Sequence, residues 1–158
     1  YLSATSVYGD HNGEWVDENS KVNPLTENGK SRLNAEKMWI NIAKKKNLPI
    51  QIFRLSGIYS QERNILEKIK SGSHQIINKP NHFFSRIHVE DISNVLKITL
   101  DSKYIKPGEI YNLSDDYPCS NIEVANYAYD LMKVSKTKMI EIHEIKNEML
   151  TEIMGRKK

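Results

Sequence analysis

The strongest constraint in this sequence is a strand, a long helix and a second strand that follow one another within the first 55 residues. β-forming residues fill positions 1–8, and Gly9 with its polar neighbours ends that strand. Positions 28–46 predict a helix, because apolar residues recur there with helical spacing, at Ala35, Met38, Trp39 and Ile42. A buried strand is predicted over 49–55. A helical crossover between two strands implies that the strands are parallel.

The rest of the chain continues the alternation of helices and strands. Helices are predicted over 64–70, 90–102 and 120–133, the last with a capping box formed by Ser120 and Glu123. Strands or extended segments are predicted over 75–78, 83–88, 109–113 and 140–145, and a turn at 80–81. This alternation predicts an α/β fold.

Composition argues against several classes of function. A formal net charge of +3, with acids mixed among the bases, does not predict nucleic-acid binding. No apolar run reaches the roughly 20 residues of a membrane helix, and from the residues given we expect no signal peptide. The single cysteine, Cys119, fits a reducing compartment, and we therefore expect a cytoplasmic protein. The five histidines form no i, i+4 pair on a predicted helix, so no metal site is predicted.

Four sequence blocks resemble the extended and atypical short-chain dehydrogenases/reductases, the NAD-dependent epimerase/dehydratase family. The segments 2–10 and 24–36 are similar to the family's Ser-Ser-x-x-Val-Tyr-Gly and Tyr-Gly-x-Ser-Lys-x-x-x-Glu stretches. The segment 53–59 is similar to the Leu-Arg-x-x-x-Val-Tyr-Gly strand. The segment 86–92, followed by 110–113, resembles the His-Val-x-Asp-Ile and Tyr-Asn-x blocks. The subgroup that the chain resembles most is the atypical set that includes the YeeZ-like proteins.

This resemblance implies a Rossmann-like doubly wound parallel sheet, of which the chain carries the C-terminal half, plus a small α/β substrate-side region. Residues 1–60 are expected to belong to the NAD(P)-binding domain. Residues 61–158 are expected to form a mixed substrate-side region that returns to the sheet at about 86–113. The family's glycine-rich dinucleotide turn is not found in the sequence. We therefore expect a fragment that lacks on the order of 100 upstream residues.

The resemblance also locates a catalytic triad, and all three of its positions are altered. In the family, a tyrosine transfers a proton, a lysine one helical turn later supports it, and a serine on the preceding strand orients the substrate. By resemblance these places are taken by Asn28, Arg32 and Ala4. An asparagine has no titratable proton near neutral pH, an arginine stays protonated, and an alanine offers no polar group. The usual mechanism is therefore not predicted for this chain.

Other residues in the matching blocks border the expected cleft. Tyr8 and His88 are candidate substitutes in catalysis, and His88 has a side chain whose ordinary pKa lies near neutral. Cofactor contacts are expected from Ser3, Thr5, Arg32, Leu55, Ser56 and Gly57. Substrate contacts are expected from Tyr59, Arg63 and Arg86. The cofactor is expected to be NAD or NADP, and the sequence does not discriminate between them.

Three hypotheses for the function remain open at this point. The first is an epimerase, dehydratase or reductase that acts on a sugar nucleotide or a small carbonyl or hydroxyl substrate through an atypical site. The second is a non-catalytic NAD(P)-binding sensor or interaction protein of the same fold. The third, a basic nucleic-acid-binding module, rests on the net charge alone. The partner is expected to be a small molecule, and the helix over 28–46 offers a surface for a homodimer.

Overall fold

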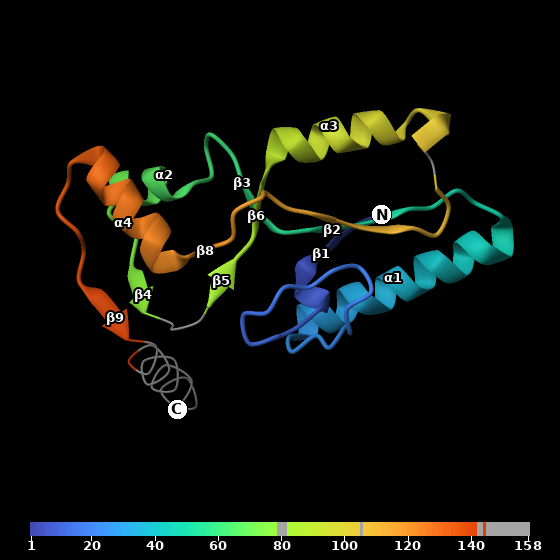
Figure 1. Ribbon diagram of the computed structural model, residues 1–158, viewed down its shortest axis with the longest axis horizontal. Helices are drawn as coiled ribbons and strands as arrows, with labels where there is room; N and C mark the ends of the chain where they lie inside the picture. The colour runs from blue at the N-terminus through green and yellow to red at the C-terminus, as the bar shows by residue number, and fades with distance from the viewer. Residues whose placement is uncertain (79–81, 105, 142–143, 145–158) are drawn as a thin grey trace, which may run out of the picture. The chain divides into compact units, whose positions relative to one another are not determined.

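The computed structural model describes residues 1–78, 82–104, 106–141 and 144, and it divides into two compact units (Figure 1). Unit 1 contains Tyr1–Ser60 and Ser85–Pro118, and unit 2 contains Gln61–Phe84 and Cys119–Lys158. The predicted turn at 80–81 and most of the second half of the predicted strand at 140–145 lie outside the described residues. The two units are described separately below.

Unit 1 is built on three parallel strands, β1 (Leu2–Ala4), β2 (Ile52–Leu55) and β7 (Ile110–Leu113), in the order β1-β2-β7. Ala4 lies opposite Leu55, and Leu55 lies opposite Leu113, so the three strands end at the same edge of the sheet. A second parallel pair is formed by β3 (Gly57–Tyr59) and β6 (Arg86–His88). The predicted α/β class with parallel strands is confirmed. Strand β3 was not predicted, because Ser56 and Gly57 were interpreted as the end of the preceding strand.

Helices α1 (Glu27–Lys46) and α3 (Val89–Thr99) pack against different faces of this sheet (Figure 1). Side chains alternate along β2, so Phe53 and Leu55 point to one face and Arg54 to the other. The α3 face holds an apolar core of Phe53, Leu55, Ile87 and Ile92, with Val95, Leu96, Tyr111 and Leu113 packed around it. Helix α3 ends at Thr99, before the predicted limit at residue 102. A short 3₁₀ helix, η2 (Ser102–Tyr104), follows it.

Helix α1 begins and ends with clear capping residues. The Thr26 side chain accepts a hydrogen bond from the Gly29 backbone N–H, and Asn47 ends the helix in the left-handed conformation. The predicted boundaries agree to within one residue. The apolar stripe that predicted the helix is not its buried face, because Met38, Trp39 and Ile42 are 65%, 41% and 40% exposed. The buried positions are instead Gly29, Glu36 and Ala43.

The first strand is shorter than predicted. It stops at Ala4 and continues as the 3₁₀ turn η1 (Thr5–Val7), and the loop that follows is closed at its neck by the Asn23 N–H, which donates to the Tyr8 carbonyl over 3.1 Å. Gly9 lies in this neck with φ +80°, and a Cβ atom there would stand 2.0 Å from the Asn23 carbonyl oxygen. Only glycine satisfies both the conformation and the close approach.

We expect Gly9→Ala to lower the free energy of unfolding by about 2 kcal/mol, because it combines left-handed backbone strain with a steric clash. Gly108→Ala is the matched control, since Gly108 has φ +84° but no atom within 4 Å of the added Cβ. That control is expected to cost only about 1 kcal/mol, from the backbone conformation alone. Urea denaturation of both variants measures the difference. Equal losses in the two variants would show that the neck is not closely packed.

In the residues that the structure describes, unit 2 has helices α2 (Ile65–Lys70) and α4 (Asn121–Met132) and four short strands. Strands β4 (Ile76–Asn78) and β9 (Met139–Glu141) pair in parallel, and β5 (Phe83–Phe84) and β8 (Cys119–Ser120) pair antiparallel. The core contains Ile76, Ala125 and Tyr129, with Ile65, Ile69 and Ile122 packed against them. The structure confirms the predicted capping box of Ser120 and Glu123 at the start of α4.

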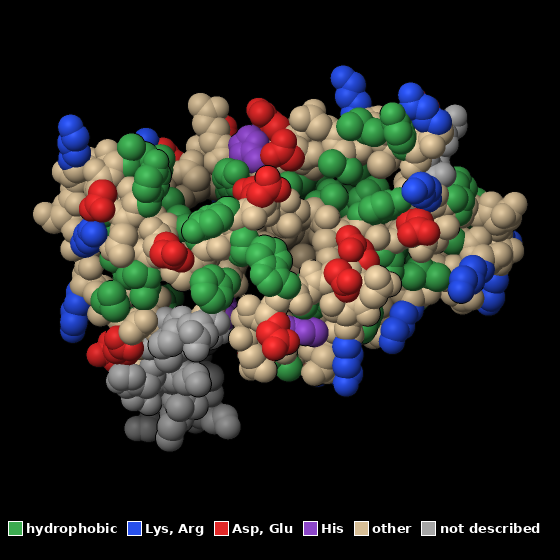
Figure 2. Space-filling view, viewed as in Figure 1, with side chains coloured by type: hydrophobic (Ala, Val, Ile, Leu, Met, Phe, Trp, Pro, Cys, Tyr) green, Lys and Arg blue, Asp and Glu red, His purple; other side chains and the backbone are tan. Residues whose placement is uncertain are grey.

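Two features of the whole described chain bear on its surroundings. Within the ranges given above, no helix has both the length and the apolar composition needed to cross a membrane. Figure 2 shows both acidic and basic side chains on the face in view.

Candidate functional site

The candidate site lies in unit 1, at the edge where the parallel strands end. In open α/β sheets, ligands bind outside the carboxyl ends of the strands. Hydrogen bonds connect the residues at and after the ends of these strands. The Thr5 hydroxyl donates to the Leu55 carbonyl over 3.4 Å, and the Ser56 hydroxyl donates to the Leu113 carbonyl over 2.9 Å. The structure therefore brings together four of the predicted cofactor contacts, Thr5, Leu55, Ser56 and Gly57.

The start of α1 packs against the same edge. A Cβ atom on Gly29 would stand 2.9 Å from the Ser6 carbonyl oxygen, so the first turn of α1 lies directly on the 3₁₀ turn that follows Ala4. Asn28 and Arg32 lie in the first two turns of α1 and are both exposed. Their spacing of four residues places them on one face of the helix. The three positions of the altered triad are thus carried by β1 and by the part of α1 that packs beside its end.

Asn28 and Arg32 can hold a ligand, but none of the three side chains can move a proton in the usual way. The half-buried Ala4 carries no polar group, and the Asn28 amide can donate and accept hydrogen bonds without titrating. The Arg32 guanidinium is exposed, and in the part of the chain that the structure describes it has no ion-pair partner. Five N–H donors in a fixed fork suit ribose hydroxyls or phosphate oxygens. The donor set therefore fits the ribose side of a dinucleotide.

Ser3 belongs to a buried ionic network rather than to the open edge. Its hydroxyl donates to Oε1 of Glu36 over 2.5 Å. Arg54 binds the same carboxylate through two nitrogens, Nε to Oε1 at 3.1 Å and Nη2 to Oε2 at 2.8 Å. Glu36 and Arg54 are 1% and 4% exposed. A bidentate arginine–carboxylate pair of this kind fixes α1 against β1 and β2.

The network continues from Arg54 through Tyr8 to β7. Nη1 of Arg54 donates to the Tyr8 hydroxyl over 2.9 Å, and that hydroxyl donates to Oδ1 of Asn112 over 2.7 Å. The Asn112 N–H donates to Oε1 of Glu18 over 2.6 Å, which attaches the loop after Gly9 to β7. Burial lowers the pKa of Arg54, but its hydrogen bonds to Glu36 and Tyr8 outweigh that effect and raise it overall. Tyr8 is 2% exposed, so its hydroxyl serves this network and is closed to a ligand.

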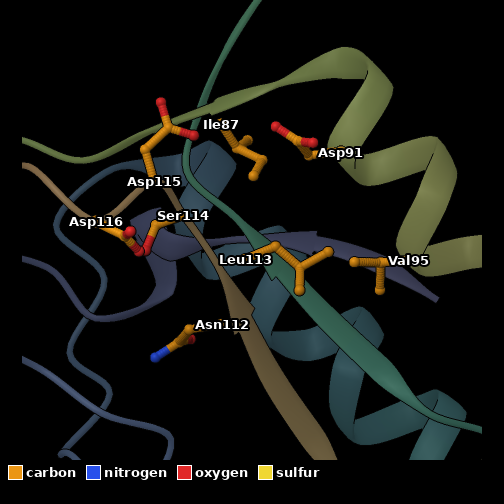
Figure 3. Close-up of a pocket in the computed structure, with 8 residues that line it drawn as sticks. All are labelled: Ile87, Asp91, Val95, Asn112, Leu113, Ser114, Asp115 and Asp116. Carbon is orange, nitrogen blue, oxygen red and sulfur yellow. The ribbon is translucent and has the colours of Figure 1, made fainter.

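A cavity of about 410 Å³ opens beside the end of β7 (Figure 3). Its lining combines an apolar floor with polar and acidic groups, from Ile87, Asp91, Val95, Asn112, Leu113, Ser114, Asp115 and Asp116. In Figure 3 the Ile87 side chain lies between those of Asp91 and Asp115. Asp91 comes from the first turn of α3, and Asp115 follows β7. The cavity therefore lies at the same carboxyl edge as the altered triad.

Tyr59 and His88 lie side by side at the ends of β3 and β6. They are paired in register, and their ring centroids are 5.1 Å apart in an edge-on arrangement. The carboxylates of Asp115 and Asp91 lie near enough to Tyr59 to raise its pKa. His88 is the N-cap of α3, where its Nδ1 accepts from the Glu90 N–H over 3.4 Å. The candidate substitute His88 thus has a structural task as the cap of α3.

The two arginines predicted for the substrate lie in different units. Arg86 is half-buried in β6 of unit 1, and its carbonyl accepts a hydrogen bond from the Asp115 N–H over 2.5 Å. This backbone contact places Asp115 beside the β3–β6 pair. Arg63 is exposed in unit 2, ahead of α2.

The surroundings of Tyr59 shift its ionisation to a higher pH. Burial raises the pKa of Tyr59 above its ordinary value of about 10, and the neighbouring carboxylates of Asp115 and Asp91 add to this effect. Because the pKa of Tyr59 is higher in the folded state than in the unfolded chain, neutral Tyr59 contributes to the free energy of unfolding. That contribution is fully present below the ordinary pKa and is lost as the pH rises through the folded-state pKa. We expect Asp115→Asn to lower the pKa of Tyr59, as measured by ¹³C NMR of labelled tyrosine. Asp116→Asn is the neighbouring control, and an unchanged titration in Asp115→Asn would contradict this effect of Asp115.

Sequence reasoning missed four residues that organise this edge, Glu36, Arg54, Asn112 and Asp115. All four were inside or directly after the blocks that resemble the family. A signal was present for one pair. An arginine in the middle of the apolar strand 52–55 requires a buried partner charge, and Glu36 is the acid that lies among the apolar positions of the neighbouring helix.

The comparison with known proteins found similarity only among solved structures. No protein-family model and no curated protein matches the chain. A conserved protein of unknown function from Silicibacter pomeroyi is 40% identical over 90% of this chain and 49% of its own length, with a TM-score of 0.83. The dTDP-glucose 4,6-dehydratase of Bacillus anthracis, solved with NAD, is 18% identical over 89% of this chain and 48% of its own, with a TM-score of 0.76.

The UDP-glucuronic acid 4-epimerase of Bacillus cereus, also solved with NAD, has 19% identity, a TM-score of 0.77 and coverage of 89% of this chain and 48% of its own. The chain thus spans about half the length of each of these proteins. The two enzymes share the fold of this chain, and identities of 18% and 19% show the shared fold alone. Their fold is that of the NAD-dependent epimerases and dehydratases, as the sequence blocks predicted at the level of fold.

Proposed function

We propose that this chain is the nicotinamide-side half of an NAD(P)-binding protein related to the NAD-dependent epimerases and dehydratases. In this proposal its three parallel strands belong to a Rossmann-like doubly wound sheet, and unit 2 is a substrate-side region. The protein acts on a sugar nucleotide or a small carbonyl or hydroxyl substrate through an atypical site. The observation that carries the proposal is the common edge formed by the ends of β1, β2 and β7, against which the first turn of α1 packs.

The proposed cofactor contacts follow from the groups at that edge. Arg32 donates hydrogen bonds to the ribose or a phosphate, and the backbone around Thr5, Leu55 and Ser56 borders the nicotinamide side. A bound dinucleotide would supply hydride acceptance or donation. In the same proposal Tyr59 and Arg86 of unit 1 contact the substrate. The exposed Met38, Trp39 and Ile42 of α1 are where a second subunit would pack.

The second candidate is a non-catalytic protein that binds NAD(P) as a sensor or interaction module. One observation favours it: Ala4, Asn28 and Arg32 offer no hydroxyl that can give or take a proton. The two candidates share the cofactor and the fold, so only turnover separates them.

The test is cofactor-dependent turnover of the intact protein with dTDP-glucose or UDP-glucuronic acid, in the native form and as Asn28→Ala. Turnover that survives Asn28→Ala supports an enzyme that uses other residues for proton transfer. Loss of about 100-fold in that variant would make Asn28 part of the chemistry of this atypical site. Absence of both dinucleotide binding and turnover in the folded protein would contradict the proposal. Dinucleotide binding without turnover on either compound supports the sensor.

A further inference from the structure

We propose that the Tyr129 hydroxyl is the centre of a clasp that holds β9 against β4 in unit 2, and that this clasp opens when His74 takes up a proton. The clasp is the pair of hydrogen bonds that joins Tyr129 to His74 and to Thr137. All three residues belong to unit 2, whereas the proposed function rests on the sheet edge of unit 1. The inference is therefore independent of the proposed function.

The clasp lies where the two strands begin. Ile76, the first residue of β4, is paired in register with Met139, the first residue of β9. His74 and Thr137 each stand two residues before these positions. The Tyr129 hydroxyl lies 3.3 Å from Nδ1 of His74 and 3.0 Å from Oγ1 of Thr137. One hydroxyl therefore joins the two chain segments at the point where they enter the parallel pair.

The strand pair is short enough to need this support. Each strand has three residues, and in the described part of unit 2 these two strands form a sheet of their own. A pair of strands is only marginally stable in water unless other groups support it. At the far end Nδ2 of Asn78 donates to both carboxylate oxygens of Glu141, over 2.9 and 3.1 Å. The clasp supplies the support at the near end.

Tyr129 is the fixed part of the clasp. Its side chain is 2% exposed and packs with Ile76 and Ala125 in the core of unit 2. A hydroxyl at this depth requires protein partners. His74 is half-buried, with its ring centroid 5.7 Å from that of Tyr129, and Thr137 is exposed. The parts of the clasp that can move into water are therefore His74 and Thr137.

Protonation of His74 changes what the clasp can hold. When the neutral ring carries its proton on Nε2, Nδ1 is an acceptor and Tyr129 can donate to it. In the charged ring both nitrogens are donors, so this hydrogen bond has to reverse. A positive charge then stands half-buried beside a core tyrosine, which is unfavourable. Opening of the clasp returns the charged ring to water.

The charged groups around His74 add to this cost. Burial lowers the pKa of His74 below its ordinary value of about 6.5, and the charge of Lys68 on α2 lowers it further. The acids on the packed elements are engaged elsewhere: Glu67 with Lys70, Asp130 with Lys136, Glu123 in the capping box of α4 and Glu141 with Asn78. Because the folded-state pKa is lowered, the stabilisation is present above the ordinary value and is lost as the pH falls through the folded-state value.

Hydrogen exchange of the backbone amides of β4 and β9 tests the clasp in the intact protein. Protection factors, which divide out the intrinsic pH dependence of exchange, are compared at about pH 7.5 and about pH 5.5, on either side of the ordinary histidine pKa. They should be about threefold to tenfold lower in the acid sample, because one unit of pKa difference is a factor of ten in an equilibrium. Equal protection at the two pH values would overturn the inference.

Three variants assign the effect to the clasp. In His74→Gln the titrating group is gone, so the protection factors of β4 and β9 should be equal at the two pH values. In Tyr129→Phe they should be low at both. His11→Gln is the matched control, because His11 lies in unit 1, and it should retain the full fall in acid. A fall that persists in His74→Gln would overturn the inference, since another group would then cause it.

A fourth variant decides should Tyr129→Phe fail to fold. Thr137→Val changes an exposed residue and removes the second hydrogen bond of the same hydroxyl. It should lower the protection of β4 and β9 at both pH values, and unchanged protection would overturn the inference.

The exchange experiment uses neither a dinucleotide nor a sugar nucleotide, so the two proposals fail separately. Dinucleotide binding together with pH-independent protection of β4 and β9 would remove the clasp and leave the proposed function. Protection that falls in acid, in a protein that binds no dinucleotide, would remove the proposed function and leave the clasp.

Discussion

Glu36→Ala is expected to lower the free energy of unfolding by about 3–5 kcal/mol, because it leaves the buried Arg54 guanidinium without its carboxylate. The Glu36–Arg54 pair is bidentate, and the two side chains are only 2% and 4% exposed. The same substitution also removes the acceptor of the buried Ser3 hydroxyl. Urea denaturation followed by circular dichroism measures the loss.

Two comparisons separate this effect from a general loss of charge. Glu27→Ala breaks the exposed Lys30–Glu27 pair at the start of the same helix and should cost only about 0.5 kcal/mol. The double variant Glu36→Leu with Arg54→Met should be more stable than Glu36→Ala alone, because no unpaired charge remains buried. A loss below about 1 kcal/mol in Glu36→Ala would contradict a closed, desolvated network.

Arg32→Ala is expected to weaken dinucleotide binding by about 10–100-fold, the cost of losing a charged hydrogen-bond donor to the ligand. Arg32→Lys keeps the charge but not the fork of donors, so an intermediate loss is expected. Fluorescence titration with NADH and NADPH measures both variants.

Lys30→Ala is the matched control for Arg32, since Lys30 is an exposed cation on the same helix that is already paired with Glu27. Its substitution should leave the affinity unchanged. If Lys30→Ala and Arg32→Ala weaken binding equally, the effect is one of general charge, and the assignment of Arg32 to the ribose or phosphate would be wrong.

Local signals in the sequence were sufficient to predict both ends of α1 and the start of α4. The cap residues Thr26 and Asn47 agree with the predicted limits of α1, and the Ser120–Glu123 box agrees with the start of α4. These signals involve residues three or four positions apart, so they require no knowledge of the rest of the fold.

The buried face of α1 could not be predicted from hydrophobic periodicity. Periodicity assumes that the apolar side is buried, but α1 turns Glu36 to the sheet and compensates it with Arg54 from β2. The apolar residues Met38 and Trp39 consequently remain exposed. A pattern based on apolar residues alone cannot detect a helix face that is buried through an ion pair.

The altered triad could be located from sequence because its positions are defined by local spacing within two blocks. The contacts that determine what the site can do are long-range. The hydrogen bond of Tyr8 to Asn112 spans 104 residues, and that of Arg54 to Glu36 joins β2 to α1. Only the register of β1, β2 and β7 brings such residues to one edge. The structure was therefore needed to show that Tyr8, a candidate substitute in catalysis, is buried in this network.

The most direct test of the account is a calorimetric titration of the intact protein with NADH and, separately, with NADPH. The account predicts saturable binding of at least one of the two, with one dinucleotide per chain and a clear loss of affinity in Arg32→Ala. Absence of binding by both dinucleotides at millimolar concentration, in a protein shown to be folded, would contradict it.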